Sequence, residues 1–145
     1  MDLFRTFAVD EKKLSGGVWH VIEPTTDYPV EESAIGERCA VLVASMDSPT
    51  YRQAIERRMK PHAFRRAPVE AAVRDRITME AIAETIILDW RNWEIGGETI
   101  PYSQAKVIEF LTQPKWVRLR ERLMGVMGDV DAFNVQQEAD IVKNS

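Results

Sequence analysis

Few residues in the sequence could bind a soft metal or act as a nucleophile. Cys39 is the only cysteine, and His20 and His62 are the only histidines. These residues do not make up a tetrahedral zinc set, and a single cysteine has no partner for an internal disulfide. The counts therefore argue against enzymes that depend on a soft metal or on a cysteine–histidine pair.

Two further pairs of residues have spacings that occur in functional sites. Glu80 and Glu84 lie four residues apart, on one face of a helix, as the two carboxylates of an acid–base or metal site would. No histidine lies near them in the sequence, so we interpret them as a solvated face. Gly96 and Gly97 would cradle a phosphate only between a strand and a lysine-bearing helix, and we predict a turn instead. We predict a protein that is not an enzyme, with no catalytic residue, metal or cofactor.

A basic segment between Tyr51 and Arg66 could make electrostatic contacts. It carries one acidic side chain, Glu56, and Arg52 is the first of its basic ones. Beside Tyr51 and Phe64 the segment could bind phosphates and stack on bases, but the net charge of −4 argues against general affinity for nucleic acid. It could also face solvent or an acidic surface of this chain, another copy or a partner, and we favour a protein surface. The candidate electrostatic contacts are Arg57, Arg58, Lys60, Arg65 and Arg66.

Charge alternates in blocks along the chain. Residues 47–76 hold eight basic and four acidic side chains, whereas residues 1–46 hold four and eight and residues 77–114 hold two and six. Opposite blocks of two copies can attract one another. We therefore expect a homo-oligomer, a ring or spiral in which the basic block of one copy meets an acidic block of the next.

Length and composition indicate one domain that must position these residues. A chain of 145 residues, 45% hydrophobic and 29% charged, is typical of a soluble globular protein. No apolar run approaches the ~20 residues of a membrane span, and residues 1–14 are too charged for a signal peptide. We expect a single domain over residues 1–145, located in the cytoplasm, with a strand-bearing part at 1–46 and a helical part at 47–145.

The expected fold class is α+β, mainly α, with a small N-terminal β-hairpin or sheet followed by four to five helices. Residues 18–22 and 38–44 are rich in β-branched and other apolar side chains, which predicts two strands, and Pro24 should end the first. Two strands alone are marginal in water, so helices must cover them.

Helix signals follow Met46. Ser48 and Pro49 predict a helix that ends near Lys60. A longer helix is predicted from Pro68 to beyond Trp93, where Gly96-Gly97 should end the segment, because apolar residues recur at four-residue spacing along it: Val69, Val73, Ile77, Ile82, Ile86 and Trp90.

Two more helical regions are expected towards the C-terminus. Ser103 should cap a helix over about residues 104–112, with Tyr102 packing on Val107 as a hydrophobic staple. The last region should run from about Lys115 to about Val142, with a bend around residues 125–128.

Trp90 and Trp93 are three residues apart near the glycine turn. Tryptophan is usually found in the core, but it is also enriched at the centres of protein interfaces. The two residues are therefore candidates for either role, with the core favoured.

One block of the sequence resembles the tail assembly chaperones of long-tailed, siphovirus-like bacteriophages. The similar elements are a leucine–aspartate–tryptophan segment, a glycine turn and an isoleucine–proline–tyrosine–serine helix start. In this chain they are Leu88-Asp89-Trp90-Arg91-Asn92-Trp93, Gly97 and Ile100-Pro101-Tyr102-Ser103. Looser similarity extends over roughly residues 16–144.

The resemblance implies a non-enzymatic assembly factor. Members of that family bind the tape measure protein, keep it soluble, help the tail tube protein polymerise around it, and are absent from the mature virion. Trp90, Trp93, Pro101 and Tyr102 are then candidate partner-contact or fold-defining residues. A structural virion component, such as a head–tail connector or tail completion protein, is the alternative, and a small regulatory or nucleic-acid-binding protein is a third.

Overall fold

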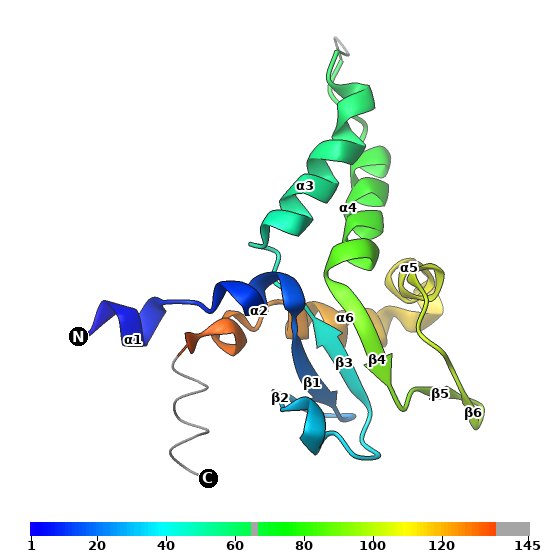
Figure 1. Cartoon of the computed structure of the whole chain (residues 1–145). Coiled ribbons are helices and arrows are strands. Elements are labelled where there is room, and N and C mark those ends of the chain that lie inside the picture. Colours follow the sequence, from blue (N-terminus) through cyan, green and yellow to red (C-terminus); the bar gives the residue numbers. More distant parts are fainter. Residues whose placement is uncertain (65–66, 136–145) are drawn as a thin grey trace.

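The computed structural model describes residues 1–64 and 67–135. They form a four-stranded antiparallel sheet with helices on one face, a two-helix hairpin that projects from the sheet, and a small second hairpin of strands (Figure 1). The class is α+β, mainly α, as the sequence predicted. None of the helices in the described parts has the length and hydropathy of a membrane span.

The sheet has the order β2-β1-β3-β4. Its strands are β1 (Val18–Ile22), β2 (Asp27–Pro29), β3 (Ala40–Val43) and β4 (Ile87–Arg91). The two predicted strands are β1 and β3, which pair with Trp19 opposite Leu42. The edge strand β2 has only three residues, and its Pro29 has no backbone donor to offer at this edge.

Strand β4 corrects the prediction of one long helix from Pro68 to beyond Trp93. Helix α4 (Ala71–Thr85) already ends at Thr85, and the chain then pairs with β3 so that Trp90 lies opposite Val41. The short run Ile86–Leu88 is apolar throughout, and periodicity cannot assign such a run to helix or strand. Pairing with β3 satisfies backbone groups that an isolated β1–β3 ladder would expose.

The segment after β4 also contains strands where helix or turn was expected. Strands β5 (Glu94–Ile95) and β6 (Glu98–Thr99) pair across the Gly96-Gly97 turn. The predicted turn is confirmed, with φ of 59° and 84° at the two glycines. Positive φ at both central residues is typical of a type I′ hairpin turn, which glycine adopts without strain.

The remaining helices largely follow their sequence signals. Helix α3 (Pro49–Met59) is capped by Ser48, and α5 (Gln104–Thr112) is capped by Ser103, whose Oγ accepts a hydrogen bond from the Lys106 amide at 3.1 Å. Helix α6 (Val117–Met127) ends at Gly128 and is followed by a 3₁₀ turn, Val130–Phe133. The expected helix end near Val142 lies outside the described residues.

Two short N-terminal helices were not predicted. They are α1 (Leu3–Phe7) and α2 (Glu11–Gly16), each capped by an aspartate side chain. An isolated bridge between Val9 and Asn134 joins the segment between them to the chain after α6. Helices of five and six residues are too short to show a clear hydrophobic periodicity in the sequence. The capping residues Asp2 and Asp10 were the sequence signal for them.

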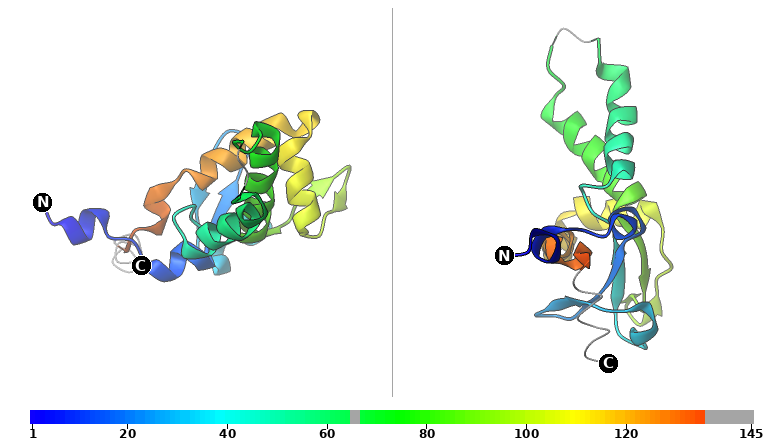
Figure 2. Two further views of the ribbon diagram at one scale, coloured as in Figure 1. Left: turned by 90° about the horizontal axis from the view of Figure 1, so that it is seen from above. Right: turned by 60° about the vertical axis from the view of Figure 1, so that its left-hand side comes forward.

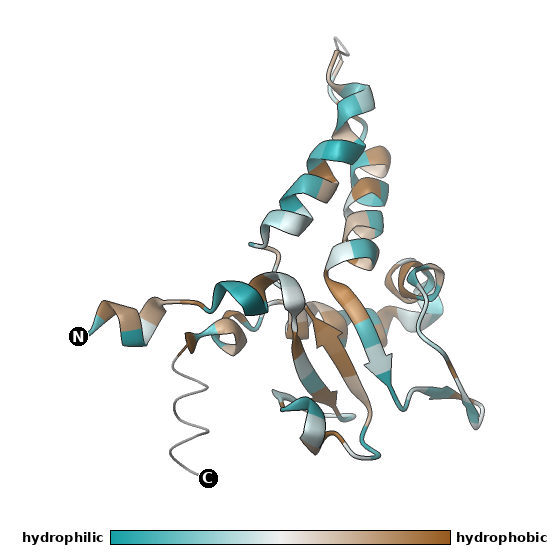
Figure 3. Ribbon diagram, in the orientation of Figure 1, coloured by the Kyte–Doolittle hydropathy of each residue, from teal (hydrophilic) through white to brown (hydrophobic). Residues whose placement is uncertain are grey.

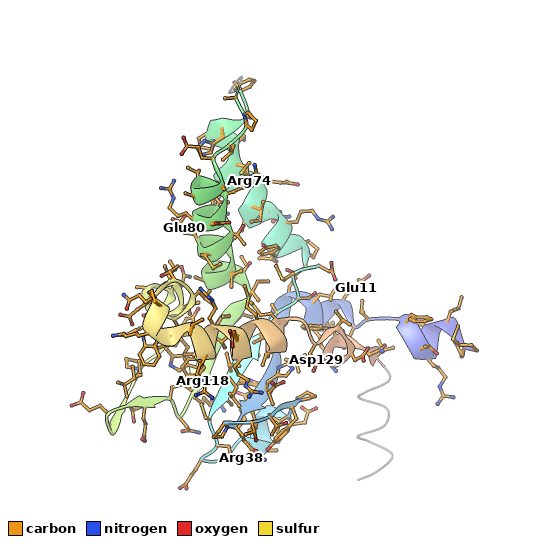
Figure 4. All side chains as sticks on the ribbon, turned by 180° about the vertical axis from the view of Figure 1, so that it is seen from behind. Glu11, Arg38, Arg74, Glu80, Arg118 and Asp129 are labelled. Carbon is orange, nitrogen blue, oxygen red and sulfur yellow. The ribbon has the colours of Figure 1, made fainter. Side chains whose placement is uncertain are left out.

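The main core lies between one sheet face and helices α4, α5 and α6 (Figures 2 and 4). It includes Val41 and Val43 from β3, Phe110 from α5 and Leu123 from α6. The opposite face is covered by the loop between β2 and β3, where Ile35 packs against Trp19 and Ala40. The strand-bearing and helical parts therefore share one core.

Candidate functional site

An aromatic cluster forms where the block resembling tail assembly chaperones meets α5. Its rings belong to Trp90, Trp93, Tyr102, Phe110 and Trp116. The indoles of Trp90 and Trp93 stack with their centroids 4.3 Å apart and their planes 4° from parallel. Phe110 tilts against both, at 5.7 Å and 5.8 Å.

Hydrogen bonds from these rings join segments that are distant in sequence. Trp93 Nε1 donates to the Ala40 carbonyl at 3.0 Å, and Trp90 Nε1 donates to the Ile100 carbonyl at 2.8 Å. The Tyr102 hydroxyl donates to the Ile87 carbonyl at 2.6 Å. Burial and the nearby Asp89 charge raise the pKa of Tyr102, so the hydroxyl keeps this proton at neutral pH.

The four residues that the sequence marked as partner-contact or fold-defining candidates differ in their exposure to solvent. Trp90 and Trp93 are only 5% and 6% exposed, Tyr102 is partly buried, and Pro101 is exposed before the α5 cap. The two indoles therefore hold β3, β4 and the segment before α5 together. Pro101 and the residues of β5 and β6 are exposed parts of this block.

Asn92 is a structural residue that the sequence analysis missed. It has a φ of 63°, and its Nδ2 donates to the carbonyls of Gly36 and Arg38 at 3.0 Å and 2.7 Å. Asparagine tolerates the left-handed region better than other side chains, which was the available signal. Its bonds fix the end of β4 against the loop before β3.

The basic segment makes ion pairs within the chain. Arg57 and Arg58 on α3 reach Glu84 on α4 at 2.6 Å and 2.7 Å, and Arg58 lies 3.5 Å from Glu80. Lys60 is exposed, and Arg65 and Arg66 lie outside the described residues. The basic segment was expected to face solvent, nucleic acid or an acidic protein surface. For Arg57 and Arg58 the structure shows an acidic surface of the same chain.

Glu80 and Glu84 are therefore more than the solvated face that their spacing suggested. Their side chains are 40% and 32% exposed, and their carboxylates hold α3 against α4 through Arg57 and Arg58. The spacing of the two glutamates did not indicate these ion pairs, because Arg57 and Arg58 lie more than 20 residues away in sequence and only the hairpin brings them near.

The Arg58–Glu84 pair predicts a pH-dependent loss of stability. The hydrogen bond from Arg58, and the charges of both arginines, hold the pKa of Glu84 below its ordinary value of 4.5, although burial partly opposes this. A depressed folded pKa adds stability above 4.5 that is lost as the pH falls through the folded value. We expect Glu84→Gln to flatten this acid limb in urea titrations at a series of pH values.

The exposed Glu98 on β6 provides the matched control. Glu98→Gln should leave the acid limb of the stability profile as it is in the parent protein. Equal slopes for the parent and Glu84→Gln below pH 4.5 would show that the ion pair contributes nothing to folding.

Cys39 and His20, whose side chains could be reactive, are partly and fully buried, respectively. Burial raises the pKa of the Cys39 thiol to about 11, so the nucleophilic thiolate is scarce at neutral pH. His20 is fully buried, with Nε2 3.5 Å from a carboxylate oxygen of Asp129. Within residues 1–64 and 67–135, no group of three or more histidine, cysteine, aspartate or glutamate side chains is placed to hold a metal ion.

Exposed apolar side chains mark two other places on the surface. Phe64, at the end of the α3–α4 hairpin, is 99% exposed. Leu3, Phe4 and Phe7 on α1 are each about two-thirds exposed, at 66%, 66% and 65%. Figure 1 shows both elements projecting from the body of the molecule.

A family model described as YdaY prophage protein matches residues 46–144. The chain belongs to this family. The YdaY match contains α3, α4, the aromatic cluster, α5 and α6, whereas α1, α2 and strands β1–β3 precede it. No curated protein and no solved structure matches the chain. Membership of the YdaY family indicates a phage-derived protein.

Proposed function

We propose that this phage-derived protein is a tail assembly chaperone. It would bind the tape measure protein in the host cytoplasm, keep it soluble, and promote assembly of the tail tube protein around it without entering the mature virion. The observation that carries the proposal is the block from Leu88 to Ser103, which resembles those chaperones and lies inside the range matched by a prophage family.

The projecting α3–α4 hairpin offers a surface for such a client. The tape measure protein is expected to present apolar helical stripes, and amphipathic helices are commonly held through apolar anchors. Phe64 is fully accessible at the hairpin end, with the exposed Lys60 nearby in sequence. A holdase acts by binding the aggregation-prone state and lowering its free concentration, so this mechanism requires no chemical step.

Co-expression with the tape measure protein of the same prophage tests the proposal. We expect more soluble tape measure protein with this chain than without it, and a complex that a pull-down recovers. Phe64→Ser should reduce both readouts, because one exposed apolar anchor is removed while the fold is untouched. Ile95→Ser on β5, where the side chain is 40% exposed, is the matched control.

The salt dependence of binding should distinguish apolar from phosphate-like recognition. Raising salt should slow association and leave much of the complex intact, because charge contributes more to encounter than to final affinity. Equal solubility of the tape measure protein with and without this chain, and no recovered complex, would contradict the proposal. The virion-component alternative would then be supported by finding this chain in purified particles.

A further inference from the structure

A histidine side chain is buried in the sheet, on the face that meets the end of α6. His20, in the middle of β1, pairs with Pro29 of β2 on one side and with Val41 of β3 on the other, and it is 0% exposed. Figure 3 shows that β3, beside it, is hydrophobic along its length. Each nitrogen of such a ring needs a hydrogen-bond partner, because a buried polar group left unsatisfied costs free energy.

The two ring nitrogens of His20 face two oxygen acceptors. Nδ1 lies 3.2 Å from the carbonyl oxygen of Val18, and Nε2 lies 3.5 Å from a carboxylate oxygen of Asp129. A carbonyl oxygen can only accept a hydrogen bond, so Nδ1 must be the donor in the first contact. Nε2 has no hydrogen-bond partner among the described residues.

A neutral imidazole cannot serve both oxygens. It has one N–H group, so when Nδ1 donates to Val18 the lone pair of Nε2 points at the carboxylate of Asp129. The imidazolium has two N–H groups and serves both oxygens, with opposite charges facing each other. The Asp129 side chain is 32% exposed and so has room to approach the ring. The contact is therefore attractive when the ring is protonated and unfavourable when the ring is neutral.

The elements around His20 carry further charged and titratable groups, although β1 and β3 contribute none besides His20 itself. Asp27 on β2 pairs with Arg122 on α6 at 3.0 Å. The remaining groups are Tyr28 on β2, Arg118, Arg120 and Glu121 on α6, Asp131 on the 3₁₀ turn, and Asp10, Glu11, Lys12 and Lys13 at α2. Among all these side chains, imidazole is the one that ordinarily changes its charge between pH 5 and 8.

Asp129 begins the segment after α6, and this segment anchors the N-terminal part of the chain. The Asp10 amide donates to the Phe133 carbonyl at 2.8 Å, and the Val135 amide donates to the Ala8 carbonyl at 3.2 Å. Figure 4 shows Asp129 at the end of α6 that is nearest the N-terminal helices. The contact between His20 and Asp129 therefore connects the sheet to the segment that holds the N-terminal part in place.

We propose that His20 and Asp129 form a proton-dependent latch between β1 and the segment after α6. The latch is closed when both ring nitrogens of His20 carry a proton, and it loosens when Nε2 loses its proton to water. Its stabilisation is therefore present at low pH and lost as the pH rises, which is the opposite direction to the ion pairs of Glu84. Loosening gives more freedom to the N-terminal segment that bears α1. The latch does not depend on binding of the tape measure protein.

Hydrogen exchange of single amides between pH 5 and 8, followed by NMR spectroscopy on the full chain, tests the latch. The amides of Asp10 and Val135 are the two anchor amides, and the Lys106 amide, bonded to Ser103 Oγ, is the reference. After correction for the intrinsic pH dependence of exchange, protection of the anchor amides should fall relative to the reference as the pH rises. We expect a factor of about five or more, because a charge-assisted hydrogen bond is lost.

An isosteric variant removes the need for the proton. Asp129→Asn carries an amide that can donate to the Nε2 lone pair of neutral His20, so protection of the anchor amides should no longer depend on pH. Glu98→Gln removes an exposed carboxylate on β6, and His62→Gln removes the other histidine. Both control variants should keep the pH dependence of the parent protein.

Nitrogen-15 NMR spectra of the His20 ring give a second readout, which needs no variant. We expect Nδ1 to carry a proton across the whole pH range, and Nε2 to gain one as the pH falls. A neutral ring protonated at Nε2 would overturn the proposal. So would anchor-amide protection that is independent of pH in the parent protein, or an unchanged pH dependence in Asp129→Asn.

Discussion

Replacing Trp93 with alanine is expected to lower the free energy of unfolding by about 3 to 5 kcal/mol, which is the usual range for loss of a buried tryptophan. The ring is 6% exposed and stacks on Trp90 at 4.3 Å. Its removal leaves a cavity and deprives the Ala40 carbonyl of the donor at 3.0 Å. Urea denaturation followed by far-UV circular dichroism measures the change.

Trp93→Phe separates the two contributions. Phenylalanine keeps an aromatic ring against Trp90 and Phe110 but cannot donate to the Ala40 carbonyl, so the loss should be smaller than for alanine. If Trp93→Ala shifted the urea midpoint by no more than an exposed substitution such as Ile95→Ser, the aromatic cluster would not be the centre of the core.

Replacing Gly17 with valine is expected to cost about 3 kcal/mol or more, from backbone strain together with overpacking. Gly17 has φ 85° and ψ 168° at the end of α2, a conformation that is essentially restricted to glycine. A Cβ atom there would lie 3.0 Å from Leu42 Cδ1 and 3.2 Å from Leu88 Cδ1. Thermal unfolding followed by circular dichroism gives the measurement.

The neighbouring Gly16 is a matched control for this substitution. It lies inside α2, and a Cβ atom there meets nothing within 4 Å. Gly16→Ala should leave the melting temperature unchanged or raise it slightly, because alanine favours helix. Similar losses at both positions would show that the turn into β1 does not depend on the conformation of Gly17.

The block from Leu88 to Ser103 shows which structural features a sequence motif predicts before the fold is known. The Ser103 cap and the turn at Gly96 and Gly97 were predicted correctly, because both depend on hydrogen bonds and φ values within a few residues. The strand containing Trp90 was assigned to a helix, because its pairing partner, Val41, lies almost fifty residues earlier. The motif contains two tryptophans that the structure buries, but it did not indicate their secondary structure.

The sequence by itself determined the fold class, the two central strands of the sheet, β1 and β3, and the helix starts at Ser48 and Ser103. These features depend on local propensity, capping and glycine conformation. Only the tertiary structure decided that residues 87–91 complete the sheet and that Glu84 holds Arg57 and Arg58. It also decided that no residue of α1 is buried among residues 1–64 and 67–135. Each of these depends on which surfaces remain after the core is buried, and that is settled by contacts between segments far apart in the chain.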